Sequence, residues 1–255
     1  MSTNGLLLAF VMLLGLGAAG QCLADAADDA LTARIARQLD EPGRDPYDVD
    51  KDPGRKPVET MRFAGVREGM TVLDLITGAG YNAEILAAAV GPTGTVYAQN
   101  SHFVLTLLDG ARHDAMLARL EDDRLPQVRY LVVDTEDMPF EGRIDLAFWG
   151  LNFHDLYNSG GEQAVLPVLA AVKGALKPGG LFVLSDHVGI AGQDNAALHR
   201  IEPRLMLEML GKAGFEVEAT SDVLGNPADD HTLNVTDDGI RYHTDQILVR
   251  ARKRK

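Results

Sequence analysis

The sequence VLDLITGAGYNAEIL, residues 72–86, joins an apolar run to two glycines and an amphipathic segment of helical spacing. Asp74 lies within the apolar run, and Gly78 and Gly80 follow it in a short turn. Glycine lets a backbone approach a ligand closely, and the positive end of the following helix favours electron-rich groups. We therefore predict a nucleotide-type ligand at this turn. A tight turn without a ligand would also favour glycine and is the alternative interpretation.

Two histidine–aspartate pairs could supply proton-transfer chemistry. His154 and Asp155 follow one apolar segment, and Asp186 and His187 follow the next. Histidine suits this role because its unperturbed pKa lies near neutrality. We expect both pairs to lie over the reactive end of a bound cofactor, with His154 as the first candidate for a catalytic base and His187 as the second. A purely structural role is the alternative for either histidine.

The sequence predicts no metal site. Asp229, Asp230 and His231 offer carboxylate and imidazole groups, which suit several divalent ions. These residues and the two pairs above are spread over separate loops, however, without a dense ligand spacing such as H-x-x-x-H. The two adjacent aspartates are explained more simply as turn residues.

Alternating strands and helices are expected to position these residues. The predicted strands are Thr71–Ile76, Thr95–Gln99, Val128–Val133, Ile144–Trp149, Leu181–Ser185, Phe215–Thr220 and Gln246–Arg250. The predicted helices are Gly80–Val90, Val104–Ala118, Glu162–Leu176 and Ala196–Ala213. Apolar strands that alternate with helices imply a mostly parallel sheet covered on both faces. Since no long helix joins the last two strands, we predict a Rossmann-like, doubly wound α/β fold whose seven-stranded sheet has an antiparallel last strand.

The predicted domain spans residues 27–255, and residues 27–70 form an N-terminal extension of it. Ala27–Leu39 places apolar residues at intervals of four, which is typical of a helix. Asp40–Pro57 is rich in Asp, Pro and Gly and is predicted to be a loop. Helical spacing resumes in VETMRFAGV, before the first strand.

The first 26 residues are expected to be an export signal. Leu6–Gly20 is an uninterrupted apolar run, too short to span a bilayer comfortably, and ADA at residues 24–26 has the spacing of a signal-peptidase site. We expect export to the periplasm, or membrane anchoring if the segment is not cleaved. Cleavage would also remove Cys22, the only cysteine, and would leave a mature chain without disulfides, cysteine-ligated zinc or a membrane-inserted segment.

The net charge of the chain argues against a nucleic-acid partner. With 37 acidic and 24 basic residues the formal charge is -13, and a chain of this charge repels phosphate groups. We therefore expect the partner to be a small molecule.

Five segments, in the observed order, resemble the class I S-adenosylmethionine-dependent methyltransferases. They are VLDLITGAG, VVDTEDMPF, IDLAFWGLNFHDL, LKPGGLFVLSDH and AGFEV, and the resemblance covers roughly Met70 to Lys253. HRIE, NPADD and RYHTDQILV further suggest a subgroup of small predicted methyltransferases that carry an N-terminal signal sequence. The resemblance implies S-adenosylmethionine as the cofactor, with methyl transfer to a small-molecule acceptor. The residues that it places around the cofactor are Asp74, Gly78, Gly80, Tyr81, Gln99, Asn100, Asp134 and Thr135.

Two positions depart from the pattern of that family. Ile76 stands where the family usually has a glycine, so the loop must adopt a conformation that tolerates a β-branched side chain. The acid that normally ends the second strand and holds the ribose hydroxyls is absent, and Gln99 and Asn100 offer neutral amides there. Charge-assisted hydrogen bonds are roughly twice as strong as neutral ones, so we expect a modest affinity for the cofactor.

Two other functions fit parts of the sequence. A module of the same fold could bind a nucleoside-like ligand or a partner without catalysis. The segment GAGYNA also satisfies G-x-G-x-x-A, which is a pattern of NAD(P)-dependent oxidoreductases. For NAD, however, the acid expected about twenty residues further on is replaced by Asn100. Tyr47 and Lys51 have the Tyr-x-x-x-Lys spacing of short-chain dehydrogenases but precede the first strand.

Overall fold

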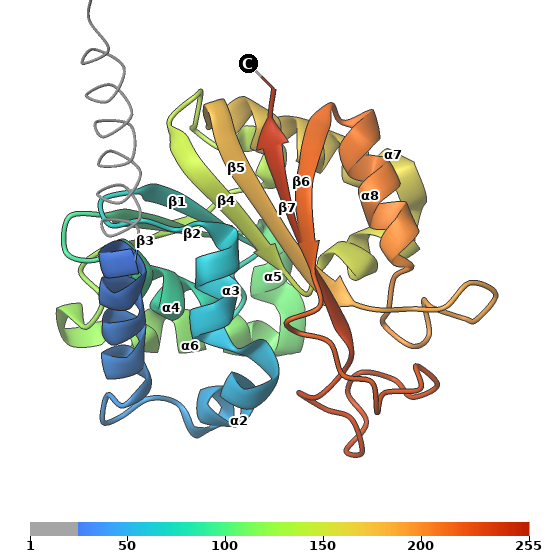
Figure 1. Cartoon of the computed structure of the whole chain (residues 1–255), viewed down its shortest axis with the longest axis horizontal. Helices are drawn as coiled ribbons and strands as arrows, with labels where there is room; N and C mark the ends of the chain where they lie inside the picture. Colours follow the sequence, from blue (N-terminus) through green and yellow to red (C-terminus); the bar gives the residue numbers. More distant parts are fainter. Residues whose placement is uncertain (1–24, 255) are drawn as a thin grey trace, which may run out of the picture.

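The computed structural model describes residues 25–254, which form a seven-stranded sheet with helices on both faces (Figure 1). The strands are β1 Thr71–Leu75, β2 Thr95–Asn100, β3 Val128–Val132, β4 Ile144–Gly150, β5 Leu176–His187, β6 Phe215–Ser221 and β7 Gln246–Lys253. Their order in the sheet is β3-β2-β1-β4-β5-β7-β6. The first five strands are parallel, and β7 runs antiparallel to both β5 and β6. The predicted Rossmann-like fold with an antiparallel last strand is therefore confirmed.

Side chains of the central strands alternate between two hydrophobic clusters, one on each face of the sheet. Val72, Val96 and Leu146 belong to the cluster on the face covered by α3 (Pro57–Ala64), α4 (Tyr81–Val90) and α6 (Ala111–Arg119). Leu73 and Ala147 belong to the cluster on the face covered by α7 (Phe153–Ala175) and α8 (Pro203–Lys212). Because both faces of a parallel strand are buried, such strands have continuous apolar sequences, which is why their positions were predictable.

The α-helices and the short 3₁₀ helices (η) have the following bounds: α2 Pro46–Arg55, α3 Pro57–Ala64, α4 Tyr81–Val90, α5 His102–Thr106, η1 Leu107–Gly110, α6 Ala111–Arg119, η2 Glu121–Asp123, η3 Thr135–Asp137, α7 Phe153–Ala175 and α8 Pro203–Lys212. A helix also covers residues 25–39, and its Leu31 and Ile35 side chains are buried as their spacing predicted. The helix predicted over Gly80–Val90 is confirmed as α4.

Three other predicted helices differ from the structure. The segment 104–118 is broken into α5, η1 and α6, since Leu108, Asp109 and Gly110 have positive φ angles. The helix predicted from Glu162 begins earlier, at Phe153, and is interrupted at Gly161, where φ is 59°. The helix predicted from Ala196 begins only at Pro203, because residues 195–199 form turns.

The prediction of a loop over Asp40–Pro57 is wrong for its second half, which is helix α2. Asp45 caps the helix by accepting a hydrogen bond from the Tyr47 amide, and Pro46 occupies the first helical position. Local and tertiary contacts then stabilise a helix of poor intrinsic propensity. Arg44 pairs with Asp52 at 2.6 Å and Lys51 pairs with Asp48 at 2.8 Å, both within this segment, whereas Arg119 reaches Asp48 from a distant helix.

The predicted export signal, residues 1–26, lies outside the described residues except for Asp25 and Ala26, which belong to the first helix. Among the helices of residues 25–254, none has the length and apolar character needed to cross a membrane.

A buried ion cluster joins α2, α4 and α6 beside the turn that follows β1. The guanidinium of Arg119 contacts the carboxylates of Asp48 and Glu84, and Arg124 binds Glu84 at 2.6 Å. All but Arg124 have side chains no more than 5% exposed. Burial alone would raise the pKa values of the two carboxyls, but the neighbouring cations outweigh it and lower both. Arg119 also donates to the carbonyl of Ala79 at 2.9 Å, so the cluster supports the turn directly.

We predict that Arg119→Met destabilises the protein by roughly 3–5 kcal/mol, because it leaves buried carboxylates without their main counter-charge. Urea unfolding of both proteins measures the difference. The control is Arg204→Met, which removes an exposed pair with Glu208 at 3.0 Å and should cost at most about 1 kcal/mol. Equal losses in the two variants would contradict the role of the buried cluster.

Candidate functional site

The residues predicted to hold the cofactor gather at one edge of the sheet. β1 lies between β2 and β4, so the carboxyl ends of these parallel strands are neighbours. Asp74 lies within β1, and Gln99 and Asn100 end β2. The other predicted residues follow the strands or begin a helix: Gly78, Gly80, Tyr81, Asp134 and Thr135. In a doubly wound sheet this edge is where ligands bind.

The turn after β1 has an unusual backbone. The φ angles of Ile76, Gly78 and Gly80 are 51°, 60° and 90°, so all three residues lie in the left-handed region. This region is accessible to glycine but is rarely adopted by a β-branched residue. Ile76 thus takes a glycine-type conformation at a position where the resembled family usually has glycine. The turn is anchored to β2 by the Thr77 amide, which donates to the Gln99 carbonyl at 2.8 Å.

Asp74 is fully buried and only partly satisfied. Its Oδ2 atom accepts a hydrogen bond from the Thr77 hydroxyl, whereas Oδ1 has no hydrogen-bond partner within residues 25–254. Burial raises the pKa of this carboxyl to about 7, although the Thr77 bond, the charge of Arg55 and the backbone amide of Ala83 act in the opposite direction. A buried acceptor without a donor is the kind of group that a bound ligand or an ordered water satisfies. The residue therefore fits a ligand-binding role.

Gln99 and Asn100, the predicted ribose partners, instead hold the turn. Asn100 accepts a hydrogen bond from the Gly78 amide and donates one to the Gly78 carbonyl, each at 2.9 Å. Gln99 accepts from the Ile76 amide at 3.0 Å and donates to the Val133 carbonyl at 2.7 Å. Both amides are buried. Their hydrogen bonds explain how the turn keeps its left-handed conformation.

Helix α6 packs closely against the same turn. A Cβ atom placed on Gly80 would lie 2.5 Å from the sulfur of Met116, and one on Gly78 would lie 3.2 Å from a guanidinium nitrogen of Arg112. A side chain at position 80 would therefore displace Met116, and the φ angle of 90° also favours glycine there. This observation supports the tight-turn interpretation beside the ligand-binding one.

Asp134 and Thr135 follow β3. The Asp134 carboxylate accepts from the His102 amide at 3.0 Å and lies 3.2 Å from the His102 ring nitrogen Nδ1. The hydrogen bond from the His102 amide lowers the pKa of Asp134. The side chain is 43% exposed, so it can meet a ligand from solvent, whereas Thr135 is buried.

Tyr81 lies on the other side of the turn and is buried against α2. Its hydroxyl donates to Asp52 at 2.8 Å, and the guanidinium of Arg55 lies 4.4 Å from the centre of its ring. Arg55 and Tyr81 also line a small cavity of about 20 Å³, which has room for about one water. The contribution of Asp52 and Arg55 was missed because their segment was predicted to be a loop. The Asp45-Pro46 helix-start signal could have revealed it.

The two histidine–aspartate pairs meet at the ends of β4 and β5. The buried carboxylate of Asp186 accepts from the His154 amide at 2.7 Å and lies 2.7 Å from His154 Nδ1. The other ring nitrogen of His154, Nε2, lies 3.2 Å from Asp155. Burial disfavours a charged imidazole, but the charges of Asp186 and Asp155 outweigh it and raise the pKa of His154 to about 10. With this pKa His154 is protonated at neutral pH, whereas a general base must be unprotonated to accept a proton. The role of His154 as a base stays a prediction.

His187 has the opposite electrostatic character. Its Nδ1 lies 2.6 Å from the Thr244 hydroxyl, and its ring centre lies 5.6 Å from that of His154. Burial lowers the pKa of His187 to about 3. Of the two predicted bases, His187 is therefore the one that is neutral at physiological pH, as a general base must be.

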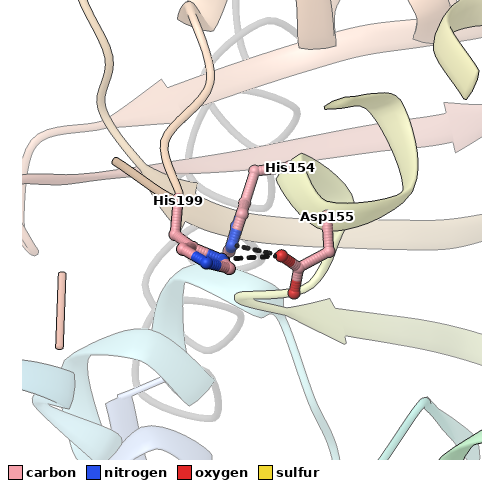
Figure 2. A group of neighbouring side chains, drawn as sticks. All are labelled: His154, Asp155 and His199. Carbon is pink, nitrogen blue, oxygen red and sulfur yellow. Dashed lines mark hydrogen bonds and ion pairs between the residues drawn. The ribbon is translucent and has the colours of Figure 1, made fainter. Parts of the chain in front are cut away.

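His199 and Arg200 were placed on a predicted helix, but the structure puts them in the turn before α8. This turn brings His199 to Asp155, with its Nδ1 2.9 Å from the Asp155 carboxylate (Figure 2). Arg200 is fully buried and forms two hydrogen bonds, of 2.8 and 3.1 Å, with Asp229. Asp229 also accepts from the His231 amide at 2.9 Å, which confirms its interpretation as a turn residue. The juxtaposition of His199 with Asp155 left no signal in the sequence, because 44 positions separate the two residues.

We predict that Asn100→Asp destabilises the protein, although it restores an acid at the end of β2. The carboxylate would lose the donor to the Gly78 carbonyl and face that oxygen without a proton, at a cost of about 1–3 kcal/mol. Urea unfolding at pH 7 measures this loss. At acidic pH the protonated side chain regains a donor, so the difference from the parent protein should shrink. A variant as stable as the parent at pH 7 would contradict the structural role of Asn100.

We predict that the parent protein loses stability relative to Asp74→Asn as the pH rises from about 4 to 7. The folded-state pKa of Asp74 is about 7, against 3.8 for the ordinary group, so in this range the native state keeps a proton that the unfolded state releases. The free energy of unfolding then falls with rising pH. Subtracting the two unfolding curves at each pH isolates this group. A flat or opposite difference would show that the Asp74 carboxyl is not held protonated by burial.

No family model matches the chain, and no curated protein matches its sequence. Solved structures match its fold. A SAM-dependent methyltransferase from Aquifex aeolicus is 21% identical over 86% of this chain and 97% of that one, with a TM-score of 0.59. Geranyl diphosphate C-methyltransferase from Streptomyces coelicolor A3(2), solved with Mg²⁺, geranyl diphosphate and S-adenosyl-L-homocysteine, is 16% identical over 85% and 87%, with a TM-score of 0.58. The [4+2]-cyclase SpnF is 19% identical over 79% and 80%, with a TM-score of 0.57. The chain has the Rossmann-like α/β fold of the S-adenosylmethionine-dependent methyltransferases.

Proposed function

We propose that this protein transfers a methyl group from S-adenosylmethionine to a small-molecule acceptor. One observation carries the proposal: within a methyltransferase fold, the turn after β1 is held in a left-handed conformation beside Asp74, whose buried Oδ1 atom forms no hydrogen bond within the described chain. A structural turn alone would not require a buried carboxyl oxygen to go without a partner. A ligand with a donor group at this edge of the sheet accounts for both features.

Two groups of residues would hold the cofactor. Gly78 and the buried Asp74 are suited to its methionine end, and Asp134, with its exposed carboxylate, is suited to the amine of the adenine ring. When bound, the cofactor supplies a methyl group already activated by a sulfonium. The chain then has to align the acceptor with that methyl group, and such positioning can contribute on the order of 7–11 kcal/mol.

The acceptor would lie at the ends of β4 and β5. His187 and His154 lie there, and a positioned imidazole can take the proton of a hydroxyl acceptor. The neutral state of His187 favours it as this base. The acidic net charge of the chain supports a small-molecule acceptor over a nucleic acid.

We also propose, from the apolar sequence of residues 6–20, that the protein is exported to the periplasm.

A different function for the same fold is supported by a separate observation. Gln99 and Asn100, the amides available for a ribose, are both bonded to the backbone of the protein. A site without free ribose partners could bind a nucleoside-like ligand only weakly, without catalysing methyl transfer. The structural neighbour SpnF is a [4+2]-cyclase. NAD-dependent oxidoreduction is a further alternative.

Calorimetry of the purified chain with S-adenosylmethionine, S-adenosyl-L-homocysteine and NAD distinguishes these functions. The proposal expects binding of the first two compounds and none of NAD. Binding of NAD alone would indicate an oxidoreductase, and binding of none of the three would favour the non-catalytic module.

We predict that Asp134→Ala weakens binding of S-adenosyl-L-homocysteine about tenfold, since the variant lacks the charged carboxylate that would accept a hydrogen bond from the adenine amine. Asp134→Ala and the control variant His102→Ala should both fold, because the side chains of Asp134 and His102 are 43% and 68% exposed. The control, His102→Ala, removes the neighbour of Asp134 but keeps the carboxylate, and it should retain affinity within a few-fold. Equal affinity for Asp134→Ala and the parent would exclude Asp134 from the site.

A further inference from the structure

Three potential metal ligands converge where α7 begins. Figure 2 shows His154 and Asp155, from the first turn of α7, facing His199 from the turn before α8. The Asp155 Oδ1 atom lies 3.2 Å from His154 Nε2 and 2.9 Å from His199 Nδ1. One ligand atom from each residue can be chosen so that all three lie within 4.8 Å of one another.

These separations match the coordination sphere of a small divalent ion. Zinc binds histidine nitrogen and carboxylate oxygen at about 2.0–2.2 Å, so two ligand atoms of a tetrahedral site lie roughly 3.3 Å apart. The two measured separations, 3.2 and 2.9 Å, are close to that value. Two of the three separations therefore already suit a tetrahedral ion, and the chosen atoms of all three residues lie within 4.8 Å of one another.

A buried carboxylate orients the central ligand. Asp186 has no exposed surface, and it accepts hydrogen bonds from the backbone amides of His154 and His187 at 2.7 and 2.8 Å. Its Oδ1 atom lies 2.7 Å from His154 Nδ1, which leaves Nε2 directed to Asp155. In metal sites a ligating histidine almost always donates its second ring N–H to such a partner, which fixes the ring orientation.

The charges of the site also suit a divalent cation. Asp155 and Asp186 contribute two negative charges, and the histidines bind an ion as neutral imidazoles. Arg200, the cation that follows His199 in the chain, is already paired with Asp229 at 2.8 Å. An ion bound at His154 Nε2 would take the place of the proton on that atom.

We propose that His154, Asp155 and His199 bind a divalent transition-metal ion such as Zn²⁺ and leave at least one coordination position for a water or a second ligand. Three protein ligands with an open fourth position are typical of catalytic rather than structural zinc sites. The side chains of Asp155 and His199 are 54% and 49% exposed, so the ion can be reached from solvent. The proposal does not depend on S-adenosylmethionine binding.

The test is metal binding by the purified full chain after treatment with a chelator. Zn²⁺ is titrated against a chromophoric chelator, and Co²⁺ is followed by its visible absorption, which reports four-coordinate geometry. We expect one ion per chain and little competition from millimolar Mg²⁺, because Mg²⁺ prefers six oxygen ligands.

His199→Asn should lower the affinity for Zn²⁺ at least tenfold and weaken the Co²⁺ spectrum. Asparagine tolerates the φ angle of 54° at this exposed turn position, so the variant should fold. Asp155→Asn should have a similar effect. The matched control is His102→Asn, which removes an exposed histidine that also lies beside a carboxylate, Asp134 at 3.2 Å, and it should leave the affinity unchanged.

The proposal is overturned if the parent chain binds neither Zn²⁺ nor Co²⁺, or if Mg²⁺ displaces them readily. It is also overturned if His199→Asn binds as tightly as the parent, or if His102→Asn loses as much affinity as His199→Asn.

Discussion

The candidate site depends on the hydrogen bonds that Gln99 and Asn100 make to the turn after β1. This turn contains Ile76 in a conformation that a β-branched residue adopts only when its surroundings impose it. The two amides supply these surroundings, because they bond the backbone of Ile76 and Gly78 from the neighbouring strand. The position that an acid would occupy in the resembled family is therefore used here for holding the turn. Thr77, which lies between these two bonded residues, in turn donates its hydroxyl to Oδ2 of Asp74.

The N-terminal extension is coupled to this turn through charge. Arg119 connects the carboxylates of α2 and α4 with the Ala79 carbonyl, and Met116, one helical turn away, packs on Gly80. Tyr81 is held from the other side by Asp52. Helix α2 thus contributes to the candidate site although it precedes the first strand. A ligand that moved the turn would have to work against this buried cluster, so we infer a largely preformed site.

The sequence predicted the sheet well and the site only in part, for physical reasons. Strands such as β1 and β4 are buried on both faces, so their continuous apolar runs reveal them. Helix α2 was missed because polar contacts with distant segments, Asp48 with Arg119 and Asp52 with Tyr81, stabilise it in place of apolar periodicity. The spacing of Asp74, Gly78 and Gly80 identified the turn. The commitment of Asn100 to Gly78 could not be predicted, since a side-chain hydrogen bond to a backbone 22 residues away leaves no pattern.

The metal-ligand geometry at β4 and β5 constrains which histidine can act on an acceptor. His154 Nδ1 faces Asp186, so Nε2 is its one remaining ring nitrogen. That atom can hold a proton, bind an ion or accept a proton from an acceptor, but it does only one of these at a time. An ion bound there would remove His154 from proton transfer and place a Lewis acid beside the acceptor instead. His187 is bonded through Nδ1 to Thr244, and its Nε2 lies outside the three-ligand cluster. The hypothesis of a base at this edge and the proposal of a metal site are therefore compatible only if His187 is the base.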